Sequence, residues 1–277
     1  MANASLPENP LPRKRIAPRQ NTSAPSLQER VLASIRFFSE TLTLSGQTIT
    51  TIIRGRFAFR DLLLQMSSIG VDAAGIVLIM AITSGSVFAL YTASMASSMG
   101  FTEIVGGTFA YVFLNELGPV LGGIAYAARS GASISAEIGA MVVTEQVDAL
   151  RAMAISPVRY LVAPKVLAAV IMLPLLTILA DVVGVGAGLV SSGMNGVPAA
   201  SFMASVYKYA SSTDLINGLI KSVVFAFLIA ITACQQGLGT KGGATGVGRS
   251  TTRSVVMCVM LITIADVFLA TLLRKNH

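Results

Sequence analysis

Residues 166–190 have the sequence VLAAVIMLPLLTILADVVGVGAGLV, in which Asp181 is the one charged side chain. About 20 apolar residues are enough for a helix to cross the hydrocarbon core of a bilayer. Four other stretches have this length and character, and the five run over residues 69–96, 104–128, 166–190, 215–236 and 254–273. The sequence therefore predicts an all-α, polytopic membrane protein with five transmembrane helices.

The composition agrees with this fold class. Of the 277 residues, 53% are hydrophobic and 12% are charged, whereas soluble domains carry about 25% charged residues. The 20 Lys and Arg residues exceed the 13 Asp and Glu residues. The positive-inside rule accounts for such a bias in a membrane protein, so we expect no nucleic-acid partner.

The chain before the first span divides into two parts. Residues 1–26 are rich in Pro, Ser, Asn and basic residues, which predicts a disordered cytoplasmic tail. Residues 27–56 have the apolar period of an amphipathic helix. We expect this helix to lie in the membrane interface, with Arg54, Arg56 and Arg60 near lipid phosphates. The alternative is a soluble helix packed on another protein. The permease domain would then comprise residues 27–277.

The distribution of Lys and Arg predicts the orientation. Sixteen of them lie in residues 1–60, 129–165 and 237–253, whereas the opposite side holds Lys208, Arg274 and Lys275. The positive-inside rule therefore places the N terminus in the cytoplasm and the C terminus outside.

Residues suited to catalysis or metal binding are scarce. His277 is the only histidine, and Cys234 and Cys258 lie apart in apolar stretches, so we expect no catalytic group, metal or cofactor on this chain. Residues 237–242 match the pattern G-x-G-x-x-G, and 243–250 nearly match a P-loop, but both motifs require a preceding β-strand. We expect a flexible cytoplasmic loop here.

A short helix is predicted in the connection between the second and third spans. Thr144 is a suitable N-cap and Pro157 would stop the helix after about three turns. The helix would carry Val147, Leu150 and Ala154 on its apolar side and Glu145, Asp148 and Arg151 on its polar side. Such a helix suits a groove on a partner, although it could equally pack on its own bundle.

Ionisable residues inside the spans are costly and therefore candidates for function. They are Glu116, Lys221 and Asp266, with Asp181 as a less certain fourth. They would form a structural network or take part in headgroup handling or gating. For Lys221 we hypothesise a contact with a lipid headgroup rather than a structural ion pair.

A further set of residues lies toward the outer end of the first span. Phe88, Tyr91, Met95 and Met99 could line an acyl-chain cavity between two subunits. The alternative is ordinary helix packing or a surface that faces lipid.

Several motifs resemble the MlaE family of permeases. They are GPVLGG at 118–123, ARSGASISAEIG at 128–139, TEQVDAL at 144–150, MAISPVRYLVAPK at 153–165 and GTKGGATGVG at 239–248. The resemblance covers about residues 30–273, and Ala128 stands where the family often has glycine.

The resemblance implies a homodimeric permease of a bacterial ABC system that moves lipids, with phospholipid as its substrate, in the inner membrane. Two cytoplasmic ATPase subunits would bind the ATP, and an MCE-domain protein would exchange lipid on the outer side. The coupling helix that docks on the ATPase would then present Glu145, Gln146, Asp148, Leu150 and Arg151. The resemblance also favours Glu116, Lys221 and Asp266 as residues of the lipid pathway.

Two other functions remain open from the sequence. An ion-coupled secondary transporter would use Glu116, Lys221 and Asp266 as a relay. A membrane-embedded enzyme would act on lipids with its carboxylates. An organellar membrane is an alternative to a bacterial one.

Overall fold

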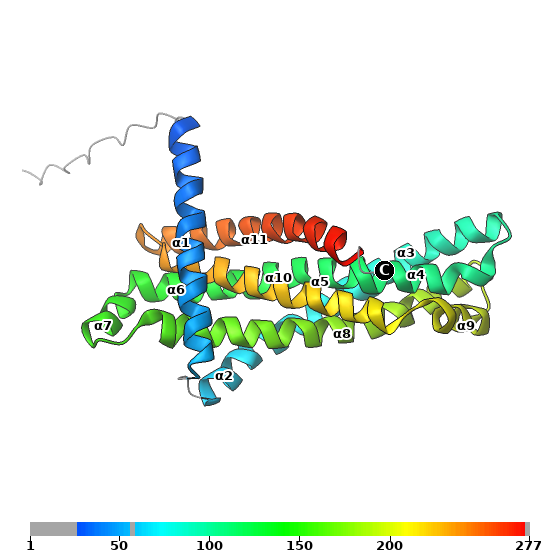
Figure 1. Ribbon diagram of the computed structural model, residues 1–277, viewed down its shortest axis with the longest axis horizontal. Coiled ribbons are helices and arrows are strands. Elements are labelled where there is room, and N and C mark those ends of the chain that lie inside the picture. The colour runs from blue at the N-terminus through cyan, green and yellow to red at the C-terminus, as the bar shows by residue number, and fades with distance from the viewer. Residues whose placement is uncertain (1–26, 56–58, 275–277) are drawn as a thin grey trace, which may run out of the picture. The chain divides into compact units, whose positions relative to one another are not determined.

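The computed structural model describes residues 27–55 and 59–274, without the side chains of residues 27–36 and Arg274. Every regular element in these ranges is a helix (Figure 1), which confirms the predicted all-α class. The predicted basic tail, residues 1–26, lies outside the described residues, as do Arg56 and Lys275.

The elements include α-helices, one 3₁₀ turn (η2) and four π-helical turns (η1, η3, η4 and η5). In chain order they are α1 (Leu27–Ile53), α2 (Phe59–Gln65), η1 (Met66–Val71), α3 (Asp72–Ser98), η2 (Thr102–Ile104), α4 (Val105–Val112), η3 (Phe113–Leu117), α5 (Gly118–Tyr126), η4 (Ala127–Gly131), α6 (Ala132–Val143), α7 (Gln146–Ala152), η5 (Val158–Val162), α8 (Ala163–Gly193), α9 (Ala199–Tyr209), α10 (Ser212–Leu238) and α11 (Gly243–Arg274).

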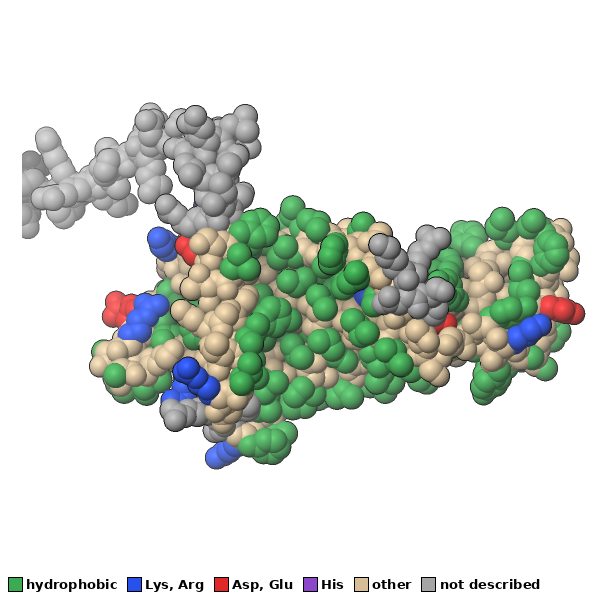
Figure 2. Space-filling model, viewed as in Figure 1, with side chains coloured by type: hydrophobic (Ala, Val, Ile, Leu, Met, Phe, Trp, Pro, Cys, Tyr) green, Lys and Arg blue, Asp and Glu red, His purple; other side chains and the backbone are tan. Residues whose placement is uncertain are grey.

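Within residues 27–55 and 59–274, five helical stretches are long and apolar enough to cross a membrane, in agreement with the sequence prediction. They are Phe59–Ser98, Thr102–Val143, Val158–Gly193, Ser212–Leu238 and Gly243–Leu273. Figure 2 shows hydrophobic side chains over the middle of the long helices and most of the visible charged side chains near their ends. The protein is therefore a multi-pass membrane protein.

The first helix, α1, extends across the boundary between two compact units. One unit ends at Phe38 and the other comprises Ser39–His277. In the second unit α1 contacts α10, because the Thr41 hydroxyl donates to Oε1 of Gln235 over 2.9 Å. The helix ends at Ile53, three residues earlier than predicted, and Gly55 follows with a φ of 61°. Glycine adopts this left-handed conformation readily and commonly ends helices.

Small residues allow α3 and α8 to pack closely. A Cβ atom added at Gly85 would lie 2.6 Å from the carbonyl oxygen of Gly184 on α8, so a larger side chain does not fit at the present spacing of the two helices. Beyond this crossing, the stacked rings of Phe109 and Phe113, with centroids 5.4 Å apart, pack against Gly184 and Gly188. Small residues are the usual means of close helix approach in membranes.

The second span continues as helix beyond the predicted end at residue 128. After the π-helical turn η4, α6 extends this helical path to Val143. The turn is held to the start of the first span, since the buried Ser130 hydroxyl donates to the carbonyl oxygen of Ile69 over 2.5 Å. The stretch that we expected to be a connection is therefore largely an extension of the bundle.

The glycine-rich stretch 237–253 also differs from the prediction of a flexible loop. Only a short turn, with Gly242 at a φ of 93° and Gly243 at 68°, separates α10 from α11. Residues Gly243–Arg274 are helical. The buried hydroxyls of Thr240 and Ser250 lie 2.8 Å apart and join the turn to the first part of α11. The near match to a P-loop is thus part of a helix.

Candidate functional site

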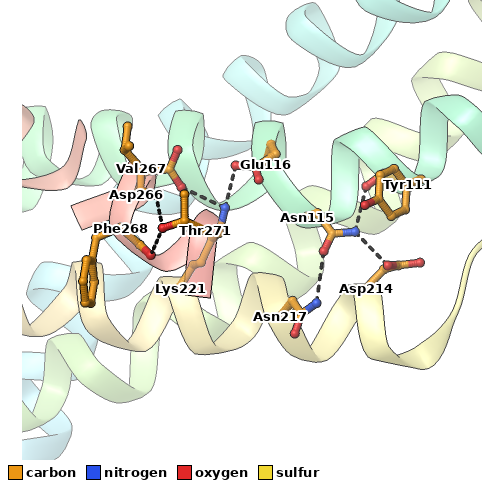
Figure 3. A network of polar contacts seen from close by, with 10 residues as sticks. All are labelled: Tyr111, Asn115, Glu116, Asp214, Asn217, Lys221, Asp266, Val267, Phe268 and Thr271. Atoms are coloured by element: carbon orange, nitrogen blue, oxygen red, sulfur yellow. Dashed lines mark hydrogen bonds and ion pairs between the residues drawn. The ribbon is translucent and has the colours of Figure 1, made fainter. Parts of the chain in front are cut away.

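A π-helical turn, η3, positions the first candidate residue, Glu116. Pro119 lies at the start of α5 and has no N–H group, so the carbonyl of Asn115 lacks the donor that it would have in a regular α-helix. Single π-helical turns interrupt α-helices at such places, often at functional sites. Here two consecutive side chains, Asn115 and Glu116, both reach α10 (Figure 3).

Lys221 on α10 is the centre of a cluster that we call the ion triad, formed by Glu116, Lys221 and Asp266. Its Nζ atom lies 2.5 Å from Oε2 of Glu116 and 2.9 Å from Oδ1 of Asp266 on α11. The exposed fraction is 2% for the Lys221 side chain, 41% for Glu116 and 20% for Asp266. The three residues that sequence reasoning selected separately therefore join three spans.

This geometry answers the question of what Lys221 contacts within the described chain. A lysine deep in a span needs partners, since its insertion without them is unfavourable by roughly 3 kcal/mol. Both carboxylates supply them, and almost none of the ammonium group remains accessible. The geometry favours the structural ion pair and does not support our hypothesis of a direct headgroup contact.

A second polar group continues from the ion triad along η3 and α10. Nδ2 of Asn115 donates to the carbonyl of Tyr111 over 3.0 Å and to Oδ1 of Asp214 over 2.8 Å. Nδ2 of Asn217 donates to Oδ1 of Asn115 over a longer 3.4 Å. Asp214 is held in turn by the backbone N–H of Ser211, as the N3 residue of a capping box at the start of α10. Sequence reasoning missed these amides because they carry no charge.

A cavity of about 460 Å³ opens beside the ion triad. Its volume lies within the range of ligand pockets, about 300–1,000 Å³. Side chains of α4, η3, α10 and α11 form its wall. The lining residues are Tyr111, Val112, Asn115, Glu116, Asn217, Lys221, Ala270, Thr271 and Leu273. The arrangement offers a compartment with polar groups on part of its wall, large enough for a headgroup, between spans that are otherwise apolar.

Asp181 lies apart from the ion triad. Its side chain is buried on α8, and neither carboxyl oxygen has a hydrogen-bond partner among the described residues. It lines a second, largely apolar cavity of about 690 Å³ between α8, α9 and α10. Gly118 packs directly against Oδ1 of Asp181, so the carboxyl group is directed toward α5.

A second buried lysine, Lys165 at the start of α8, forms another ion pair. Its Nζ atom lies 2.6 Å from Oε2 of Glu137 on α6 and 2.9 Å from Oε1 of Gln65 on α2. Only 1% of the Lys165 side chain is exposed. Sequence reasoning counted Lys165 with the cytoplasmic connection. It selected neither Lys165 nor Glu137 as a candidate, although both lie in the quoted motifs.

The short helix predicted between the second and third spans exists, but it is shorter than expected. The helix α7 has seven residues and ends at Ala152, before Pro157. The predicted N-cap, Thr144, is wrong, since its hydroxyl donates back to the carbonyl of Ala140 over 2.9 Å and so belongs to the end of α6. Glu145 precedes α7 in the left-handed conformation, with a φ of 61°.

The two faces of α7 differ in exposure as the spacing predicts. Val147 is buried and Leu150 half-buried, whereas Gln146 is exposed. The prediction for Ala154 is wrong, because this residue lies beyond the end of α7, with a φ of 59°, and is exposed. Asp148 and Arg151 are exposed and form an ion pair of 2.9 Å. Exposed apolar side chains follow the helix, namely Met153, Ile155 and Tyr160. The segment thus presents a polar rim beside apolar side chains.

The residues proposed for an acyl-chain cavity do not share one environment. The half-buried Phe88 packs against Phe109, with ring centroids 5.9 Å apart. Tyr91, Met95 and Met99 are exposed on α3. A cavity between two subunits therefore stays a prediction for these three, while Phe88 is part of the core.

Comparison with known proteins identifies relatives over most of the chain. The family described as permease MlaE matches residues 62–272. A probable ABC transporter permease protein of Synechocystis is 41% identical over 84% of this chain and 89% of its own. One from Rickettsia bellii is 37% identical over 91% and 98%. The chloroplastic Arabidopsis thaliana protein named TRIGALACTOSYLDIACYLGLYCEROL 1 is 35% identical over 82% of this chain, a match that spans 65% of that protein.

Proposed function

This chain belongs to the MlaE permease family and is a non-catalytic permease subunit, and we propose that it carries phospholipids between the inner membrane and the outer envelope, driven by ATP. The Arabidopsis relative bears the name of a galactolipid, which supports a lipid as the substrate. ATP would be bound by partner subunits, so this chain would need no cofactor.

The polar cavity beside the ion triad is the observation that carries this proposal. A phospholipid crossing an apolar bundle needs a polar compartment for its headgroup, because unpaired polar groups are costly in hydrocarbon. The cavity offers one, with Glu116 and Lys221 among the residues that line it. Glu116, Lys221 and Asp266 would accordingly mark the route of the headgroup.

The exposed face of α11 supports a homodimer. This helix presents a row of large apolar side chains, which are Val256, Met260, Ile264, Val267, Phe268 and Leu272. The same helix supplies Ala270, Thr271 and Leu273 to the cavity. A second copy packed against this row would place two cavities near the dimer axis.

The helix α7 would couple the permease to its ATPase. The exposed pair Asp148–Arg151 and the apolar Met153 beside it match the polar rim and anchor that a helix in a groove requires. The ATPase lies in the cytoplasm if the positive-inside rule sets the orientation. An MCE-domain protein would then meet the opposite end, where α9 lies.

Reconstitution separates this proposal from its rivals. We expect vesicles that contain the permease with its ATPase and MCE-domain partners to transfer labelled phospholipid only when ATP is hydrolysed. Transfer driven by an ion gradient without ATP would contradict the proposal and favour a secondary transporter. Chemical conversion of the labelled lipid by the purified chain would favour an enzyme instead.

A further inference from the structure

We propose that the cavity beside the ion triad selects lipids whose headgroup carries a primary ammonium group, as in phosphatidylethanolamine, over lipids with an anionic headgroup. This inference rests on the proposed function and adds the class of headgroup to it. Three properties of the cavity lead to it.

The first property is that Lys221 is not available to a phosphate. Both carboxylates contact its Nζ atom, at 2.5 and 2.9 Å, and 2% of the side chain is exposed. A phosphate group that reached Nζ would have to displace Glu116 or Asp266. Displacement of Asp266, whose side chain is 20% exposed, would leave a poorly solvated carboxylate without its partner, which is strongly unfavourable.

The second property is the sign of the charge that the cavity presents. In their ionised forms two carboxylates and one ammonium group give the ion triad a net charge of −1. Glu116 is its most exposed member and lines the cavity. A headgroup in the cavity therefore meets a carboxylate first, and the field there disfavours a second anion.

The third property is that several side-chain donors of the cavity wall are already engaged within the protein, whereas the Tyr111 hydroxyl and the second N–H of Asn217 have no acceptor among the described residues. Nδ2 of Asn115 donates to Tyr111 and Asp214, and Nδ2 of Asn217 donates to Asn115. The hydroxyl of Thr271 donates to backbone carbonyls of its own helix (Figure 3). The accessible charged group that the described wall offers to a ligand is thus an acceptor, the Glu116 carboxylate.

An ethanolamine headgroup complements such a wall. A primary ammonium group has three donors and a positive charge, and its hydrogen bonds to a carboxylate are of the strong, charge-assisted kind. Phosphatidylglycerol offers hydroxyl donors but carries a net negative charge. Phosphatidylcholine has the positive charge but no N–H donor. Its retention therefore distinguishes the effect of hydrogen bonding from that of electrostatic attraction alone.

The test uses the full permease with its partner subunits, equilibrated with nanodiscs that contain equal amounts of the ethanolamine, choline and glycerol phospholipids with identical acyl chains. Retained lipid is then measured by mass spectrometry. We expect ethanolamine lipid to exceed glycerol lipid by roughly tenfold, which corresponds to about 1.4 kcal/mol, and to exceed choline lipid by a smaller factor. Equal retention of the three, or an excess of glycerol lipid, would overturn the inference.

Glu116→Gln should reduce the preference for ethanolamine to within about twofold, while Glu103→Gln, the same change at an exposed residue of η2, should leave it unchanged. If Glu116→Gln does not yield folded protein, Asp266→Asn removes the same charge and should also weaken the preference. An unaltered preference in the folded variant contradicts the inference. Retention of lipid without preference would refute this inference alone, whereas retention of no lipid at all would also refute the proposed function.

Discussion

Replacing Lys221 with methionine should destabilise the permease markedly, because it removes the common partner of two carboxylates. The Asp266 side chain is 20% exposed, so the loss of its ion pair with Lys221 resembles the breaking of a buried pair. Breaking such a pair lowers the free energy of unfolding by at least about 3 kcal/mol. Glu116 is 41% exposed and contributes about 0.5 kcal/mol, as surface pairs do. The sum of about 3.5 kcal/mol corresponds to a fall in Tm of roughly 7–14 °C, at 2–4 °C per kcal/mol.

Circular dichroism in detergent suits this measurement, since the chain contains no tryptophan to report unfolding by fluorescence. Lys208→Met is the matched control: Lys208 is exposed on α9, beside the ring of Tyr209, and its loss should lower the stability by about 0.5 kcal/mol. Combining Lys221→Met with Glu116→Gln and Asp266→Asn should recover much of the lost stability, because no charge is then left unpaired. A Tm for Lys221→Met within about 1 °C of the wild type would refute the ion-triad argument.

Three further changes test other parts of the structure. Glu145→Lys combined with Asp148→Lys should abolish association with the ATPase while membrane insertion is unchanged, as measured by co-purification; an unaltered yield of complex would count against α7 as the docking site. Lys165→Met should lower the Tm by roughly 3–6 °C, since it removes a hydrogen bond to Gln65 of about 1 kcal/mol and an ion pair of about 0.5 kcal/mol with Glu137, whose side chain is 44% exposed; a shift below about 1 °C would contradict this. Gly85→Leu should prevent the close packing of α3 on α8, so that little folded protein survives solubilisation and size-exclusion chromatography; a normal monodisperse yield would show that the crossing can widen, and Gly75→Leu, where the added Cβ meets open space, is the control.

The number of spans was predictable because the bilayer imposes a length of about 20 apolar residues on each one. The same rule does not say where a helix ends outside the membrane. The path through η4 and α6 continues to Val143 because buried contacts such as Ser130 with Ile69 extend the bundle, and these contacts join residues far apart in the sequence. The start of α7 was misplaced for a related reason, since the Thr144 hydroxyl donates to the carbonyl of Ala140 behind it, whereas an N-cap hydroxyl accepts from a backbone N–H ahead of it.

The candidate site was predictable in its charged residues and not in their pairing. The cost of an ionisable group in a span selects Glu116, Lys221 and Asp266 without any structure. Which partner each one finds depends on the packing of α10 against η3 and α11, which the sequence pattern does not contain. Lys165 escaped notice because it lies at the end of a span, where a basic residue is ordinarily exposed.

The unbroken course of α11 gives the ion triad a mechanical connection to the other end of the molecule. At 1.5 Å per residue, the helix carries Asp266 about 35 Å from the turn at Gly243. The turn is also where α10, the helix of Lys221, joins α11. Because α11 is one continuous helix, an axial shift of α11 against α10 by one residue, about 1.5 Å, would displace Asp266 from Lys221 by nearly the same amount and disrupt their 2.9 Å contact. The distance between Lys221 and Asp266 thus depends on the register between the last two spans. The ion pair forms fully only when the glycine turn keeps the two helices in this register.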